Sequence, residues 1–174
     1  MGACLMKEAD IVRDCVKTMI SESSSEVSVK CRIGVDEFES YDFFKEFISN
    51  VSSSGCKTFF VHARKAFLKG LDPKKNRTLP PLKYDYVYRL KREMPQLNII
   101  INGGIQTLEE CHNQLKSVDG VMVGRSIQAN PFFLEEVDHQ FYNQKMSSLE
   151  KNQVIAKYFE YVKENIDTVS TYEL

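Results

Sequence analysis

The chain has 174 residues, 43% of them hydrophobic and 27% charged, which predicts a soluble globular protein with one domain, or one domain and an appendage. Its 23 Lys and Arg nearly balance its 24 Asp and Glu, so any affinity for nucleic acid must come from a local patch. No apolar run approaches the ~18 residues of a membrane span, and we expect no membrane contact. The five cysteines are odd in number and contain no Cys-x-x-Cys pair. We therefore expect reduced thiols in an intracellular, cytoplasmic protein rather than a disulfide framework or a metal site.

The first half of the chain alternates between helical and strand patterns. Apolar residues at helical spacing predict helices over residues 4–21 and 41–51. Short apolar runs predict strands at 27–31 and 58–61. A long basic loop then leads to a Pro-Pro pair, whose second proline, Pro81, is well placed to begin a helix that runs to about Glu93.

The segment Asn98–Ile105 allows two interpretations. An Asn-Gly pair after apolar residues is typical of a hairpin turn, but the same letters could end a buried strand. A hairpin needs a second strand directly after Gly104. Instead, Thr107 and Glu110 form a capping box that predicts a helix. We therefore predict a strand at 98–101 that ends in a loop.

The second half continues the alternation. Residues 120–123 predict a fourth strand, and the pattern is helical from about residue 131, with a break at 146–149 before a last helix. Apolar strands that alternate with helices are typical of a parallel sheet. We predict an α/β fold with about four parallel βα units over residues 1–143, and a separate helical segment over 144–174.

Each predicted strand is followed or ended by a residue that its hydrophobic run does not explain. These residues are Lys30, His62, Asn102 and the pair Gly124-Arg125. The carboxyl ends of parallel strands point to one side, where active sites of such folds lie. We therefore expect these side chains to gather on one face.

Two glycine-containing segments predict a phosphate site. Gly103-Gly104 would let backbone N–H groups approach a ligand, and the helix capped at Thr107 adds the positive end of its dipole. Arg125, after Gly124, could pair a phosphate through two N–H groups. The alternative is that the glycines only permit tight turns and that Arg125 is solvated.

Lys30 and His62 also have two interpretations each. A lysine in a barrel mouth needs an anion or an electron-rich ring, and a cation beside the pyrimidine end of a flavin stabilises its reduced form. Alternatively, Lys30 reaches solvent from the strand terminus. His62 would contact a ligand ring or phosphate beside Lys30 and Asn102, or it is a hydrogen-bonded core histidine.

The loop after His62 is strongly basic. Between His62 and Arg77 there is one acid, Asp72, against Arg64, Lys65, Lys69, Lys74, Lys75 and Arg77. This concentration suggests contact with a polyanion such as RNA, with Phe67 available to stack on a base. The alternative is an ordinary solvated loop.

Five segments together resemble one enzyme family. They are GACLM (residues 2–6), VKCRIG (29–34), HARKAFLKGLDPKKNRTLPPL (62–82), INGGIQTLEE (101–110) and DGVMVGRSIQANP (119–131). In this order they closely resemble the bacterial-type A subfamily of tRNA-dihydrouridine synthases. The resemblance implies an FMN-dependent TIM (β/α) barrel with a C-terminal helical domain, which uses NADPH to reduce the C5=C6 bond of a uridine in the tRNA D-loop.

The resemblance also implies roles for individual residues. FMN would be held by Lys30, His62, Asn102, Gly103, Gly104, Gly124 and Arg125. Arg77 and Lys30 would face the target uridine, and tRNA would be contacted by Arg64, Lys65 and Lys74. A hydride would pass from flavin N5 to C6 of uracil, and a cysteine acid would protonate C5.

One departure from the family concerns that cysteine. In the family it lies in a segment upstream of GACLM, and Cys4 matches a different position, so we assign it no catalytic role. The chain corresponds to the C-terminal half of the barrel and the start of the helical domain. We expect it to need the N-terminal half-barrel or another copy as partner, and to be inactive alone. The alternatives are a non-catalytic RNA-binding remnant, or another flavin- or phosphate-binding β/α-barrel enzyme.

Overall fold

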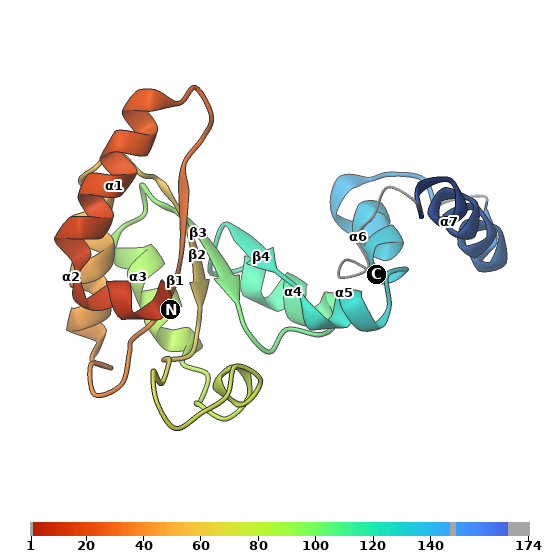
Figure 1. Ribbon diagram of the computed structural model, residues 1–174. Coiled ribbons are helices and arrows are strands. Elements are labelled where there is room, and N and C mark those ends of the chain that lie inside the picture. The colour runs from red at the N-terminus through yellow and green to blue at the C-terminus, as the bar shows by residue number, and fades with distance from the viewer. Residues whose placement is uncertain (1, 147–148, 167–174) are drawn as a thin grey trace. The chain divides into compact units, whose positions relative to one another are not determined.

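Four strands form one parallel sheet in the order in which they occur along the chain (Figure 1). They are β1 (Ser28–Arg32), β2 (Thr58–His62), β3 (Asn98–Asn102) and β4 (Gly120–Met122). The computed structural model describes residues 2–146 and 149–166. The parallel pairing of β3 with β4 confirms that Asn102-Gly103 ends a strand rather than turning a hairpin.

Helices connect the strands. Those of the sheet-containing part are η1 (Gly2–Lys7), α1 (Ala9–Glu22), α2 (Tyr41–Ser52), η2 (Lys75–Arg77), α3 (Tyr84–Glu93), α4 (Leu108–Leu115) and α5 (Arg125–Ala129). The predicted capping box of α4 is present, because the Thr107 side chain accepts from the Glu110 backbone N–H and the Glu110 carboxylate accepts from that of Thr107. The alternation of parallel strands and helices is that of a partial TIM barrel.

The two faces of the sheet are covered differently. Phe59, Val61, Ile99 and Ile101 are fully buried on the face that α2 and α3 cover. The intervening residues point to the opposite face, which lines the interior of a closed barrel. There Phe60 and Ile100 are only half-buried and Lys30 is exposed. The sheet therefore packs on one side as a barrel wall does.

Two predicted helix starts were wrong. The helix expected over 4–21 begins at Ala9, and a 3-10 turn precedes it and places Met6 in the core. The helix expected from Pro81 begins at Tyr84. The reason is that the Lys83 backbone N–H donates to the Ala63 carbonyl, which holds this segment against the end of β2.

The position of Lys30 also needs correction. Lys30 is the third residue of β1, and the strand continues to Arg32, which pairs with His62. The carboxyl end of β1 is therefore occupied by Arg32, with Lys30 one side-chain repeat below it on the same face.

The chain divides into two compact units, Met1–Ala129 and Asn130–Leu174. This division precedes the boundary expected between residues 143 and 144. The second unit contains α6 (Phe133–Tyr142) and α7 (Lys151–Asn165). Residues 147–148 and 167–174 of the expected helical segment lie outside the described residues. In the described part of the chain, no helix has the length and apolar character required to span a membrane.

An ion cluster joins α2 to α3 on the outside of the sheet. The Glu93 carboxylate accepts from the Tyr41 hydroxyl at 3.0 Å and pairs with Lys45 Nζ at 2.8 Å and Arg89 Nε at 2.7 Å. The Arg89 guanidinium also lies 3.9 Å from the centre of the Tyr41 ring. Hydrogen bonds from Lys45 and Arg89 lower the pKa of Glu93 from 4.5 to about 2.

This cluster makes stability depend on acid pH. Because the folded pKa of Glu93 is depressed, its contribution is present above pH 4.5 and is lost as pH falls toward 2. We expect Glu93→Gln to lower the urea midpoint at pH 7 and to reduce the fall of that midpoint between pH 5 and pH 2, followed by circular dichroism. Glu46→Gln, on the exposed surface of α2, is the control; an equal effect of both substitutions would contradict the assignment.

Candidate functional site

A cavity of about 520 Å³ opens at the carboxyl ends of the four strands, within the unit Met1–Ala129. Its size is that of a pocket for a cofactor or small molecule. All seven residues that the sequence assigned to cofactor binding line it: Lys30, His62, Asn102, Gly103, Gly104, Gly124 and Arg125. Arg77, assigned to the substrate, lines it as well.

The strand register explains why these side chains meet. Arg32 pairs with His62, His62 with Asn102, and Asn102 with Met122. Residues in register across a parallel sheet point to the same face, so these four form a row across the last layer of the sheet. The Asn102 amide nitrogen donates to the Met122 carbonyl at 2.8 Å and fixes one end of this row.

The cavity is positively charged without compensation from carboxylates. Lys30, Arg32, Arg77 and Arg125 line it, and none of them forms an ion pair with any residue that the structure describes. Burial, followed by the charge of Arg32, lowers the pKa of Lys30. Burial, followed by the charges of Arg64 and Arg77, lowers the pKa of Arg32. Unpaired, partly desolvated cations of this kind favour an anionic ligand.

His62 is neutral in this environment. Burial and then the charges of Arg32, Lys30, Arg64 and Arg125 lower its pKa from 6.5 to about 3. At physiological pH the imidazole therefore has one donor and one acceptor nitrogen and adds no further charge to the cavity.

The glycines of the cavity fall into two groups. Gly103 and Gly104 have φ values of 117° and 74°, in the region that L side chains rarely adopt. A Cβ on Gly103 would lie 2.7 Å from His62 Cδ2, and one on Gly104 would lie 2.7 Å from Leu82 Cδ1. The close packing of the protein itself therefore requires these two glycines. A Cβ on Gly124, by contrast, would meet no protein atom within 4 Å, so Gly124 leaves room for a ligand to approach the backbone.

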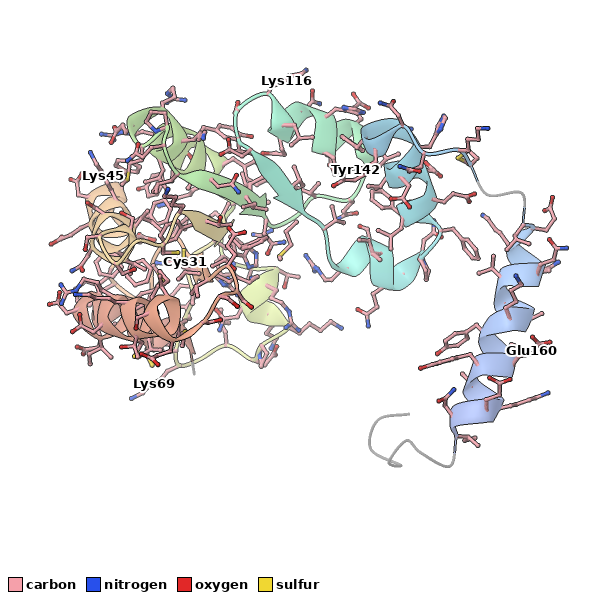
Figure 2. The ribbon with its side chains drawn as sticks, turned by 90° about the horizontal axis from the view of Figure 1, so that it is seen from above. Cys31, Lys45, Lys69, Lys116, Tyr142 and Glu160 are labelled. Carbon is pink, nitrogen blue, oxygen red and sulfur yellow. The ribbon has the colours of Figure 1, made fainter. Side chains whose placement is uncertain are left out.

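Some cations of the basic loop make contacts within the protein, and others are exposed to solvent. Lys65 Nζ pairs with Glu39 at 2.7 Å and lies 4.7 Å from the centre of the Phe67 ring. Arg64 donates from Nη1 to the Pro80 carbonyl, and its buried Nε has no hydrogen-bond partner among the residues that the structure describes. Lys74 is exposed, and Figure 2 shows Lys69 extending outward from this unit. Of the predicted tRNA-binding residues, Lys74 and Arg77 are therefore more accessible than Arg64 and Lys65.

The sequence assignment missed several cavity residues. Arg32, Ile105, Gln106, Met122, Ser126 and Ala129 also line it. Arg32 could have been found, because it lies two residues after Lys30 and the side chains of a strand repeat every two residues. The position of Met122 in the cavity depends on the register of β4 against β3. The local sequence carries no signal for this register.

The residues present fit a flavin mononucleotide. A phosphate dianion suits unpaired Arg125 and the open backbone at Gly124, and Lys30 supplies a cation on the same face of the sheet. Neutral His62 can donate to or accept from a ring or phosphate atom. The site thus offers cations and open space for the phosphate end of such a ligand.

Comparison with known proteins gives a consistent result. The family model described as dihydrouridine synthase (Dus) matches residues 1–173. The tRNA-dihydrouridine(20/20a) synthase of Pasteurella multocida is 47% identical over 165 residues, which cover 95% of this chain and 50% of the relative. The proteins of the same name from Yersinia pestis and Escherichia coli O6:H1 are 45% and 46% identical and are covered to 48% and 50% of their length.

The chain thus spans about half the length of these curated relatives. The half that it spans forms four consecutive parallel strands and contains the cavity at their carboxyl ends. On the match of nearly its whole length to the family model, the chain belongs to the dihydrouridine synthase family.

Proposed function

We propose that the chain forms the FMN-binding half of an enzyme that reduces uridine to 5,6-dihydrouridine in the D-loop of tRNA, with NADPH as the reductant. The observation that supports this most strongly is the cavity with four cations that have no carboxylate partner among the described residues, in a chain of this family. The enzyme would act in the cytoplasm.

In this proposal the phosphate of FMN binds beside Arg125 and Gly124, with Asn102, Gly103 and Gly104 on the neighbouring strand end. Lys30 and His62 contact the ring system. The flavin supplies the hydride for C6 of uracil when bound. The protein residues hold the flavin in place, and Lys30 and Arg77 orient the uridine over it.

FMN binding is the first test. We expect the chain to quench FMN fluorescence on binding, and Arg125→Ala to weaken the affinity about ten- to a hundredfold, because a charge-assisted hydrogen bond to the phosphate is lost. Gly124→Ala should also weaken binding without changing stability, since its Cβ meets only open space. Lys116→Ala, at the end of α4, is the control. Unchanged affinity in both cavity variants would contradict the assignment.

In this proposal the proton for C5 comes from a cysteine. None of the described residues lining the cavity is a cysteine. Cys31, Cys56 and Cys111 are buried, and burial raises the pKa of each thiol. We propose that the acid comes from another half of the barrel, because this chain covers only 50% of the length of the relative from Pasteurella multocida.

The chain alone should therefore bind FMN but form no dihydrouridine. We expect no mass increase of two hydrogens per uridine after incubation with FMN, NADPH and unmodified tRNA, analysed by mass spectrometry of nucleosides. Multiple-turnover formation of dihydrouridine would contradict this expectation. Cys4→Ser would then decide whether Cys4 is the acid, because Cys4 is exposed and its replacement would abolish such activity.

We further propose that the basic loop contacts tRNA through Arg64, Lys65, Lys74 and Arg77, and that residues 144–174 begin a helical tRNA-binding domain. Lys74 and Arg77 are exposed and have no ion pair with a described residue, so they can neutralise phosphates directly. Arg64 and Lys65 already make contacts within the protein. Their substitution would alter the loop as well as the tRNA contact.

Salt dependence tests the tRNA contacts. We expect Lys74→Ala and Arg77→Ala each to weaken tRNA binding and to reduce the slope of log K against log salt by about one. Lys17→Ala, at an exposed position on α1, should leave the slope unchanged. Fluorescence anisotropy with labelled tRNA measures both quantities. Equal slopes for all three variants would exclude direct phosphate contacts from this loop.

A further inference from the structure

Arg32 connects the cavity to the basic loop. It is the last residue of β1 and lines the cavity beside Lys30 and His62. Its Nη1 also donates to the backbone carbonyls of Lys65 at 3.3 Å and Asn76 at 3.1 Å. One guanidinium therefore contacts both the site at the strand ends and the loop segment 65–76.

Asn76 links the two ends of the loop segment 67–76 by hydrogen bonds to Phe67. The Asn76 side chain donates to the Phe67 carbonyl at 2.6 Å and accepts from the Phe67 backbone N–H at 2.8 Å. The Leu68 backbone N–H is bonded to the Asp36 carboxylate at 2.8 Å. These bonds join Phe67 and Leu68 to Asn76 and Asp36, and the residue that follows Asn76 is Arg77, which lines the cavity.

A second, smaller cavity of about 210 Å³ lies under the loop, lined by Phe67 and Leu71 among others. Arg32 and Arg77 line both this cavity and the larger one. The Arg32 and Arg77 side chains therefore lie between the larger cavity and the cavity under the loop.

The closed loop brings two like charges together. Burial, and then the charges of Arg64 and Arg77, lower the pKa of Arg32. No described carboxylate pairs with Arg32 or Arg77 to offset this repulsion. An anion in the cavity would interact favourably with both groups and thereby stabilise the loop conformation that places Arg77 at the site.

We propose that Arg32 is a positioning residue that couples anion binding in the cavity to closure of the basic loop 65–76, so that the occupied site orders the loop that contacts RNA. The proposal rests on the proposed function for the identity of the two ligands. The coupling itself requires only an anion in the cavity.

Amide hydrogen exchange tests the coupling with inorganic phosphate as the probe. In the wild type, phosphate at ten times its Kd should slow exchange of the Phe67 and Leu68 amides by up to about tenfold, because opening is linked to release of the anion. The chemical shift of the Gly124 amide reports phosphate in the cavity. Absence of slowing at any phosphate concentration would overturn the proposal.

The variant Arg32→Lys distinguishes a positioning role of the Arg32 guanidinium from an effect of its positive charge alone. A lysine keeps the charge but loses the guanidinium, whose Nη1 donates to both the Lys65 and the Asn76 carbonyls and whose other N–H groups are available to an anion. We expect phosphate still to shift Gly124, while the exchange of Phe67 and Leu68 no longer responds to phosphate. A wild-type response in this variant, or loss of the Gly124 shift as well, would show that Arg32 is not a positioning residue.

Two controls complete the experiment. Arg13→Lys makes the same chemical change on α1, where Arg13 contacts Asp10 and Asp14, and should retain the full phosphate response. Exchange in α2 and α3 that matches the wild type shows that Arg32→Lys is folded. A separate titration with FMN distinguishes this coupling from the proposed function. If phosphate slows amide exchange of Phe67 and Leu68 but FMN does not bind, the coupling is supported and the proposed cofactor is contradicted.

Discussion

The parallel register of β1 to β4 is the constraint on which the site depends. Because Arg32, His62, Asn102 and Met122 are paired in sequence across four strands, they form one row at the carboxyl edge of the sheet. A shift of one residue in any strand would turn its member of the row toward the buried face, where Phe59, Val61, Ile99 and Ile101 form the core. The apolar core that fixes the register thus also fixes the cavity.

The row has an electrostatic consequence. Arg32 belongs to the row, and the same cavity is also lined by Lys30, Arg77 and Arg125. None of these four cations pairs with a carboxylate among the described residues. Carboxylates are instead used outside the site, where Glu39 pairs with Lys65 and Glu93 joins α2 to α3. The cavity therefore remains positive and its histidine neutral, which is the electrostatic setting for a phosphate-containing ligand and a polyanionic substrate.

The basic loop depends on the same edge of the sheet. Arg32 holds it through two carbonyls, and Ala63 and Lys83 bond its two ends to each other. Leu82 Cδ1 would lie 2.7 Å from a Cβ on Gly104, whose φ of 74° also disfavours any other residue. The basic loop is thus built onto the strand ends that form the cavity.

The sequence by itself determined the parallel alternation, the helix cap at Thr107, and the strand-end residues that line the cavity, because each is encoded by spacing between near neighbours. It did not determine that Lys65 pairs with Glu39, that α3 begins only after Lys83, or that Gly103 is needed for packing against His62. It also missed Met122. These features arise from contacts between segments distant in the chain, so they depend on strand register and loop packing, which only the tertiary structure decided.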